Sequence, residues 1–415
     1  MSRRSRLRAR VRNALFRAVH RVPRGAISPL VANDLFHAHE SLFAFLGAFV
    51  SQRRVLFVGN EAYGAHAVRQ GAAGLTAVMT SGAALGYGRR TYAGPGLEFQ
   101  DAIPAGAAFD VVIHMGALPR DLQRLAAAVQ PNGKLLISIT PAEDAATRLR
   151  DELASRFANV RRFVHLAGAP LDFSSPDFSV VPPGAFSFEE LGAGAPVPAN
   201  ALGLVYMATD EAKWRDLQLH LGCGPISLDG WINIDNQPYA GIDFRWDLAR
   251  GIPFRNARYV FAEHFIEHLS YQQGADFTRG CRAALRDDGI LRLSTPNLDW
   301  VWQVSYHPGL WSNEDEALRD CFVLNRAFRG WGHQFLYNPA TLAALLQNSG
   351  FATVRALRYG ESDTPALAGL ERHEQYPDVP ELPHVLVVEA SGRGAPQAIR
   401  GEAHIAEYNR DVATV

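Results

Sequence analysis

Short apolar runs alternate with turn-forming residues along the first half of the chain, and this pattern predicts the buried strands of a sheet. The predicted strands are residues 54–58, 75–79, 109–114, 134–139, 161–166 and 202–207. The last two predict an antiparallel pair, separated by a Pro-, Gly- and Ser-rich excursion over 167–200. Helices are predicted over 122–129 and over the apolar stretch 41–50, which is about half as long as a membrane span.

The second half of the chain has the same alternation of apolar runs and turns. Its predicted strands are residues 217–221, 231–234, 259–262, 290–294, 353–357 and 385–389, the final two as an antiparallel pair. An amphipathic helix is predicted over 274–285. Another is predicted to begin at Asn338 and Pro339 and to end at Gly350, because these residue types favour those helix positions. Each half therefore predicts an α/β fold with a mostly parallel sheet.

An internal repeat connects the two halves. Residues 131–141 (PNGKLLISITP) are similar to residues 287–297 (DDGILRLSTPN), so that Gly133 matches Gly289 and Ser138 matches Ser294. The repeat predicts two copies of one fold, with a boundary near residues 210–216. The predicted divisions are a basic extension over 1–40, a first domain over 41–210, a second domain over 211–392 and a poorly ordered tail over 393–415.

The second copy carries the clearest candidate chemistry. A Gly222-Cys223-Gly224 turn follows the strand at 217–221, and the next strand ends at Asp235. Glycine lets the backbone turn sharply and lets a ligand approach it, while a carboxylate can accept hydrogen bonds from ribose hydroxyls. A dinucleotide site needs a third glycine and an acid about 20 residues on. Asp235 follows Gly224 after only eleven residues, so the pattern favours an adenosyl ligand instead.

Residues 217–390 resemble a class I S-adenosylmethionine-dependent methyltransferase. The similar segments are HLGCGP at 220–225, GWINID at 230–235, DL at 247–248, AEHFIEHLS at 262–270, LRDDGILRLSTPNL at 285–298, GH at 332–333 and LPHVLVVEA at 382–390. The subgroup most resembled is bacterial and is associated with surface glycans and sugars. The resemblance implies that S-adenosylmethionine is held by Gly222, Cys223, Gly224, Asp235, Asn236, Asp247, Leu248 and Glu263.

The resemblance also implies the architecture: two tandem Rossmann-like methyltransferase domains, with mostly parallel seven-stranded sheets and a terminal antiparallel strand. The first copy is interpreted as degenerate. Its turn is GNEAYG in place of GCG, and its second strand ends at Thr80 and Ser81 in place of a carboxylate. This copy is expected to pack, to dimerise or to help hold a substrate.

Histidines supply the candidate acid–base groups. His264 follows a predicted strand, and His333 lies in the segment GWGHQF, so these two are the first catalytic candidates, with His268 the third. Residues 264–268 also match the H-x-x-E-H pattern of some zinc proteases. That alternative needs the motif inside a long helix, whereas here it directly follows a strand. A bound metal is therefore not expected, and a zinc hydrolase is kept as a minor alternative.

The segment 295–337 is expected to select the acceptor. It is rich in aromatic residues: Trp300, Trp302, Tyr306, Trp311, Phe322, Phe328, Trp331, Phe335 and Tyr337. Aromatic side chains in an irregular insert after a strand favour a lid over a small-molecule or glycan acceptor. The alternative is a helical hairpin with a small core of its own.

Composition adds limits to this interpretation. The net charge is −1 and no basic stripe flanks the expected crevice, so a nucleic-acid partner is not expected. The three cysteines are dispersed, which favours a reducing, cytoplasmic location. Residues 1–24 hold nine arginines, and apolar residues at four-residue spacing over 7–19 predict either a basic helix on a membrane surface or a solvated extension. A homodimer is a further expectation, and a catalytically silent binding or scaffold protein is kept as the alternative function.

Overall fold

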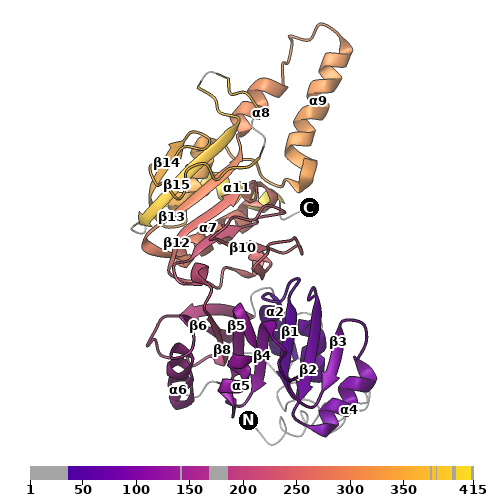
Figure 1. Cartoon of the computed structure of the whole chain (residues 1–415). Helices are drawn as coiled ribbons and strands as arrows, with labels where there is room; N and C mark the ends of the chain where they lie inside the picture. The colour runs from indigo at the N-terminus through magenta and orange to yellow at the C-terminus, as the bar shows by residue number, and fades with distance from the viewer. Residues whose placement is uncertain are drawn as a thin grey trace, which may run out of the picture. The chain divides into compact units, whose positions relative to one another are not determined.

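The computed structural model describes residues 36–140, 143–167, 186–373, 376–379, 381–394 and 399–412. Its contacts divide the chain into two compact units (Figure 1). The first unit comprises Met1–Asp216 with Asp235–Phe254, and the second comprises Leu217–Ile234 with Arg255–Val415. The predicted basic helix over 7–19 lies outside the described residues.

The first unit is built on an eight-stranded sheet in the order β3-β2-β1-β4-β5-β8-β6-β7. Its strands are β1 (Arg54–Gly59), β2 (Gly74–Met79), β3 (Leu97–Gln100), β4 (Phe109–Gly116), β5 (Val129–Ile139), β6 (Asn159–Ala167), β7 (Phe186–Leu191) and β8 (Ala201–Thr209). The first five strands run parallel, and β8, β6 and β7 pair antiparallel. Near-continuous burial of β1 explains its unbroken apolar sequence, because helices and loops cover both faces of such sheets.

The helices of the first unit connect these strands. They are α2 (Phe36–Gly47), α3 (Ala62–Val68), α4 (Gly82–Thr91), α5 (Leu122–Ala127) and α6 (Glu143–Ala154), followed by the short turn η1 (Ala212–Trp214). The Ser81 side chain accepts from the Ala84 amide at the start of α4, and Asp121 does the same for Arg124 in α5. Helix α2 begins earlier than the apolar stretch 41–50 and ends inside it.

Two strands of the first unit were not predicted. Strand β3 has only four residues, which is too short for a clear alternating pattern. Strand β7 lies within residues 167–200, which were interpreted as a loop because of their proline and glycine content. The expected seven strands are therefore eight, and residues 109–114 lie in the fourth strand in chain order, not the third.

The second unit is built on a seven-stranded sheet in the order β11-β10-β9-β12-β13-β15-β14. Its strands are β9 (Gln218–Leu221), β10 (Ile232–Asp235), β11 (Phe244–Arg245), β12 (Ala257–Glu263), β13 (Leu285–Pro296), β14 (Phe351–Leu357) and β15 (Val385–Arg393). Strands β10, β9, β12 and β13 pair parallel, whereas β15 is antiparallel to its neighbours β13 and β14. Numbered within the sheet, the order is 3-2-1-4-5-7-6, which is also that of the first sheet without β7. The predicted α/β, Rossmann-like fold class is confirmed.

Equivalent glycines mark the repeat. A Cβ on Gly133 would lie 2.8 Å from Val129 Cγ1 and 2.9 Å from the Asp110 carbonyl oxygen. A Cβ on Gly289 would lie 2.8 Å from Leu285 Cδ2 and 3.0 Å from the carbonyl oxygen of Ala257. In both units the fifth strand therefore crosses close to its parallel neighbour at a position where only glycine fits.

The segment Asp235–Phe254 belongs by its contacts to the first unit, although the sequence pattern assigns it to the second domain. The Arg245 amide donates to the Ala48 carbonyl at 2.7 Å. The rings of Phe244 and Trp246 lie 5.7 and 5.9 Å from the ring of Phe45, in edge-to-face arrangements. Apolar burial against α2 thus determines where this loop packs.

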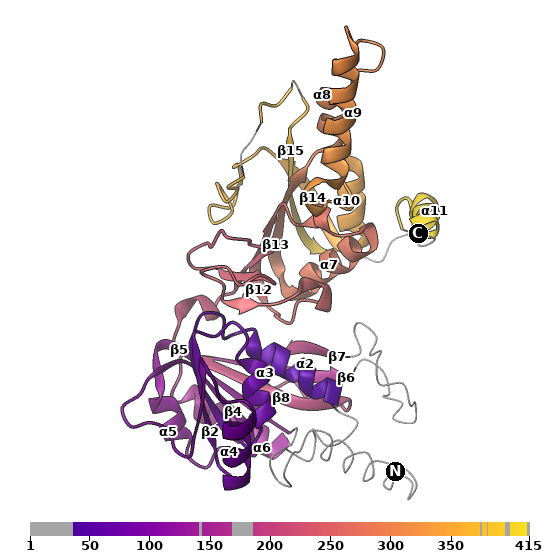
Figure 2. The ribbon, with the colours of Figure 1, turned by 90° about the vertical axis from the view of Figure 1, so that its right-hand side faces the viewer.

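The helices of the second unit are α7 (Tyr271–Ala284), α8 (Leu298–Ser305), α9 (Glu314–Arg329), α10 (Pro339–Asn348) and α11 (Glu402–Val412), with the short turns η3 (Ile266–His268) and η4 (Gly330–Gly332). The short turn η2 (Leu248–Arg250) lies in the segment Asp235–Phe254. As predicted, Asn338 caps α10, and its side chain accepts from the Thr341 amide. Helices α8 and α9 lie side by side and extend beyond the sheet (Figure 2).

The expectation of a poorly ordered C-terminal tail is wrong for residues 402–412, which form α11. The Tyr408 ring lies 6.4 Å from Tyr271 of α7 and 5.4 Å from Phe335, so tertiary contacts hold this polar helix in place. Among the described residues, none of the helices has the length and apolar character needed to cross a membrane.

Candidate functional site

The glycine turn after β9 has the backbone that its sequence predicts. Gly222 and Gly224 have φ angles of +62° and +56°, in the region that favours glycine. A Cβ on Gly222 would lie 2.2 Å from the ring of Phe265, whereas a Cβ on Gly224 would meet nothing within 4 Å. Cys223 is buried, and its amide donates to the Ile234 carbonyl at 3.2 Å. The turn is therefore packed at Gly222 and open at Gly224.

The predicted acids follow at the ends of strands. Asp235 is the last residue of β10, and its Oδ1 accepts from the Gln237 amide at 2.8 Å. Exposed Asp247 caps η2 through the Ala249 amide at 3.0 Å. Asn236 is exposed and Leu248 is buried in that same turn. As cofactor contacts, all four remain predictions.

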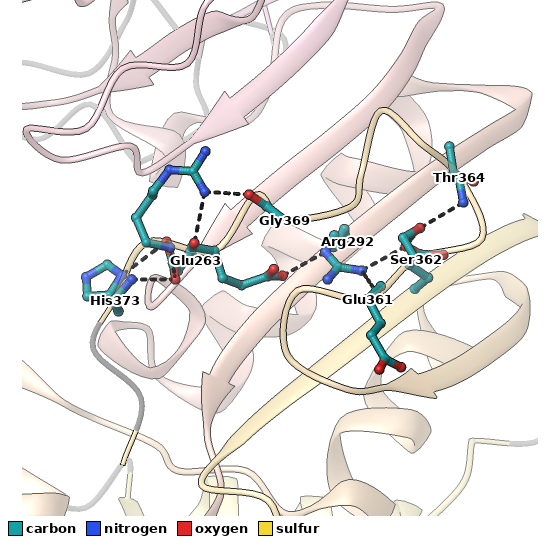
Figure 3. A network of polar contacts seen from close by, with 10 residues as sticks. Glu263, Arg292, Glu361, Ser362, Thr364, Gly369 and His373 are labelled. Carbon is teal, nitrogen blue, oxygen red and sulfur yellow. Dashed lines mark hydrogen bonds and ion pairs between the residues drawn. The ribbon is translucent and has the colours of Figure 1, made fainter. Parts of the chain in front are cut away.

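Glu263, at the end of β12, is buried and is held by the chain itself (Figure 3). Its carboxylate accepts from the amides of Arg372 and His373 at 2.9–3.0 Å and lies 3.1 Å from the His373 Nδ1. Burial raises the pKa of Glu263, but the hydrogen bonds from His373 and from the two amides outweigh it and leave the pKa lowered. The carboxylate therefore anchors the 372–373 segment, and its predicted cofactor contact stays a prediction.

The ion pair between Glu263 and His373 predicts a pH dependence. The hydrogen bond to Glu263 raises the pKa of His373 above 6.5, although partial burial lowers it. Because the folded-state pKa is raised, the stabilisation is complete below about pH 6.5 and is lost as the pH rises through the folded-state pKa. We expect an NMR titration of the His373 ring to give a pKa above 6.5 in the native chain and a lower value in Glu263→Gln. A native value at or below that of the Glu263→Gln variant would contradict the pair.

His264 lies directly beyond β12 and has a φ of +48°, an uncommon conformation for a residue with a side chain. Its amide donates to the Ser294 carbonyl at 2.9 Å, and its Nδ1 lies 3.0 Å from a carboxylate oxygen of Glu267. Its Nε2 is buried without a hydrogen-bond partner among the described residues. A proton on Nδ1 that is shared with Glu267 leaves the lone pair on Nε2, as a general base requires.

Glu267 is the residue of this site whose role the sequence did not indicate. It is fully buried, and the Thr295 hydroxyl donates to its Oε2 at 3.0 Å. Burial raises the pKa of Glu267, but the contacts with His264 outweigh this and leave the pKa lowered. The H-x-x-E-H spacing contained the signal, because it places Glu267 three residues after His264.

The structure brings His268 and His333 together across 65 residues of sequence. Their ring centroids are 5.1 Å apart, and the His333 Nδ1 lies 2.8 Å from the Ala327 carbonyl oxygen. Burial lowers the pKa of His268, against the opposing charge of Glu267. The H-x-x-E-H segment is a three-residue 3-10 turn and not the long helix that a zinc protease needs.

A buried charge cluster fixes the loop that carries His373 (Figure 3). The guanidinium of Arg292, on β13, is fully buried and lies 2.7 Å from Glu371 and 2.9 Å from Glu389. It also donates to the Glu361 carbonyl at 3.0 Å. Because an unpaired buried charge is costly, these contacts hold the loop against the sheet at residues 361 and 371.

The aromatic insert forms α8 and α9, and a small polar core joins them. Buried Asp320 accepts from the Trp311 indole at 3.0 Å and lies 2.9 Å from the His307 Nδ1. These two contacts and a hydrogen bond from Arg319 hold the pKa of Asp320 well below its usual range. The expected alternative of a helical hairpin is therefore present. Large apolar side chains nevertheless remain exposed here: Trp302, Leu310, Leu318, Phe322 and Trp331.

A hollow of about 460 Å³ lies beside α8. It is lined by Gln303, Val304, His307, Val379 and Leu382. One turn earlier, the Nε1 of Trp300 is buried without a partner in the described part of the chain, and its ring lies 4.4 Å from that of His384. Burial lowers the pKa of His384, and the charge of His264 lowers it further.

The fold class that these units define is the doubly wound, Rossmann-like α/β sheet, in which ligands bind at the carboxyl ends of the strands. No family model matches the chain, and no curated protein matches it. Among solved structures, the chain is similar to the N-methyltransferase NodS from Bradyrhizobium japonicum, with 13% identity, 48% of this chain and 100% of that chain covered, and a TM-score of 0.30.

Two further structures have comparable scores. Precorrin-6y C5,15-methyltransferase from Geobacter metallireducens is 12% identical over 41% of this chain and 87% of its own, with a TM-score of 0.29. A putative S-adenosylmethionine-dependent methyltransferase from Listeria monocytogenes is 21% identical over 25% and 55%, with a TM-score of 0.22. Because these scores are low, the fold class is assigned from the strand order of this chain, and its function is inferred from its own residues.

Proposed function

We propose that the chain is an S-adenosylmethionine-dependent methyltransferase that modifies a hydroxyl group of a small-molecule or glycan acceptor. The observation that carries this proposal is the glycine turn after β9, open at Gly224 and directly beside the strand that ends in Asp235. The backbone pairing supports the juxtaposition. Leu221 is paired with Ile234, so the residues that follow each of them leave the sheet at the same edge.

The donor set fits an adenosyl group. At Gly224 the open side of the turn leaves room for a ligand to approach the main chain. The carboxylate of Asp235 can accept from the ribose hydroxyls, and Asp247 can accept from the adenine amino group. When bound, S-adenosylmethionine supplies a methyl group whose bond to sulfur breaks, with the electron pair left on sulfur, as the acceptor oxygen bonds the methyl carbon.

His264 is the general base of this proposal. Glu267 holds its Nδ1, so the Nε2 lone pair can take the proton that the acceptor hydroxyl loses. A buried Nε2 with no partner in the described residues is what a base needs before its substrate arrives. The Thr295 hydroxyl holds the Glu267 carboxylate, and the Ser294 carbonyl holds the backbone amide of His264.

The acceptor is proposed to lie against α8. The hollow beside Gln303 and His307 is large enough for a small ligand, and the unpaired indole of Trp300 offers a hydrogen-bond donor on the same helix. Exposed aromatic residues on α8 and α9 suit the apolar faces of sugars.

The first unit is proposed to have lost cofactor binding. By strand register, the position that corresponds to Asp235 is buried Met79, and the hydroxyl of the next residue, Thr80, lies 2.9 Å from the Asn60 Oδ1 in the turn after β1. A neutral side chain in contact with the protein replaces the carboxylate. This observation supports a degenerate copy.

Two other functions are weaker. A catalytically silent scaffold would not need the unpartnered base at His264. A zinc hydrolase through His264 and His268 would need both rings to face one metal from a helix, whereas His264 contacts Glu267 and precedes a 3-10 turn.

Calorimetric titration of the full chain with S-adenosylhomocysteine tests the proposal. We expect saturable binding with one molecule per chain. A lack of binding would leave the scaffold as the better function. Binding of two molecules per chain would contradict the degenerate first unit but not the enzymatic function.

A further inference from the structure

Three metal-ligating side chains converge beside the proposed base. One carboxylate oxygen of Glu267 and one ring nitrogen each of His268 and His333 all lie within 4.8 Å of one another. We propose that these residues form a binding site for a divalent transition-metal cation such as Zn²⁺ or Mn²⁺. This departs from the sequence-based expectation of no metal. It also uses a different ligand set from the H-x-x-E-H pattern, because His333 takes the place of His264.

Backbone contacts hold the two segments of the site together. The amides of Gln334 and Phe335 donate to the Glu267 carbonyl at 2.7 and 3.2 Å, and the Gln334 Nε2 donates to the His268 carbonyl at 2.6 Å. The η3 turn is therefore fixed against the chain that follows η4. Hydrogen bonds between these two segments therefore hold the three ligand residues close together.

The orientation of His333 suits a ligand. Its Nδ1 donates to the Ala327 carbonyl at 2.8 Å, which leaves the lone pair on Nε2. Metal-bound histidines usually donate their other ring nitrogen to a carbonyl or a carboxylate. Two residues earlier, Trp331 has a φ angle of +55°, and this backbone conformation in residues other than glycine occurs often at functional sites.

Glu267 completes the set. Its fully buried carboxylate receives the Thr295 hydroxyl and faces the His264 Nδ1, and each oxygen retains a further lone pair for a cation. Ligand atoms around a tetrahedral Zn²⁺ lie about 3.4 Å apart, given bonds of about 2.0–2.1 Å. Rotation of the half-buried ring of His268 can supply the remaining closure while His333 keeps its bond to Ala327.

The donor types select the class of cation. Two imidazoles and one carboxylate favour zinc and its transition-metal neighbours, whereas Mg²⁺ and Ca²⁺ prefer oxygen ligands alone. Three protein ligands leave a coordination position open, as in catalytic zinc sites. If the proposed methyltransferase function holds, a cation here would bind the acceptor hydroxyl and lower its pKa while His264 receives the proton. His268 and His333 then bind the metal in place of their predicted acid–base roles.

Metal titration of the intact chain tests the site. The purified protein is stripped with a chelator and titrated with Zn²⁺ and with Mn²⁺ by calorimetry, without any adenosyl ligand. We expect one equivalent of cation to bind to the native chain. His333→Ala and His268→Ala should each weaken this binding by at least about 100-fold, since loss of a ligand exceeds the usual effect of an outer-shell change. His404→Ala, on exposed α11, is the matched control and should bind as the native chain does.

Two results would overturn the site. They are the absence of cation binding at 100-fold excess, and equal binding by the His333→Ala and His404→Ala variants. A far-ultraviolet circular dichroism spectrum and a melting temperature equal to those of the native chain would show that each variant is folded. Because the two titrations are independent, loss of adenosyl binding in the native chain would refute the methyltransferase and leave the metal result intact.

Discussion

Replacement of Asp235 by alanine is expected to weaken the binding of S-adenosylhomocysteine by about 10- to 100-fold. A hydrogen bond to a charged group contributes about 1.5–3 kcal/mol, and the carboxylate is proposed to receive the ribose hydroxyls. Asp235→Asn should have a smaller effect, because an amide oxygen still accepts from the Gln237 amide and from one hydroxyl. Calorimetric titration of both variants measures these differences.

The matched control for this experiment is Asp229→Ala. Asp229 is an exposed carboxylate in the loop between β9 and β10, so its removal changes the net charge equally but should leave the affinity unchanged. If Asp235→Ala binds the ligand as tightly as Asp229→Ala does, the crevice at residues 222–235 is not the cofactor site.

Replacement of His264 is expected to lower kcat by about 10²- to 10⁴-fold, the range that general acid–base catalysis supplies. Asparagine is the better substitute here, because it tolerates the left-handed backbone that His264 adopts at φ +48°. The affinity for S-adenosylhomocysteine should stay at the native value, since His264 is proposed to act on the acceptor. Radiolabelled methyl transfer to a panel of sugars and phenols, then kinetics with the best acceptor, measures the effect.

His404→Ala is the control for this second experiment, since His404 is an exposed histidine of α11. Native turnover by His264→Asn would exclude His264 as the base. A parallel loss of turnover and of adenosyl affinity would instead indicate that the turn after β9 had been disturbed, because Phe265 packs directly on Gly222.

The local sequence pattern predicted most of the strands and their order of appearance. Apolar runs such as 54–58 lie in buried strands, because burial on both faces favours continuous hydrophobic sequence. Caps are equally local, and Asn338 begins α10 as expected. Strands β3 and β7 were missed because one is short and the other lies in a proline-rich segment.

The candidate site was predictable only in part. The glycines at 222 and 224 and the aspartate at 235 belong to one short stretch, so their spacing carries the signal. The hydrogen bonds that the amides of Arg372 and His373 donate to Glu263 have no such signal, because these residues lie 109 and 110 positions from Glu263 along the chain. Glu263 and Glu267 therefore have different partners in the fold. Glu263 accepts from the amides of Arg372 and His373, whereas Glu267 contacts the proposed base His264.

By itself, the sequence determined the α/β class, the internal repeat and the glycine turn, since each depends on the preferences of neighbouring residues. Tertiary structure alone decided that residues 235–254 pack with the first unit and that α11 forms at the C-terminus. It also brought His333 to His268. These features depend on burial and hydrogen bonds between distant segments, and such contacts have no fixed spacing along a chain.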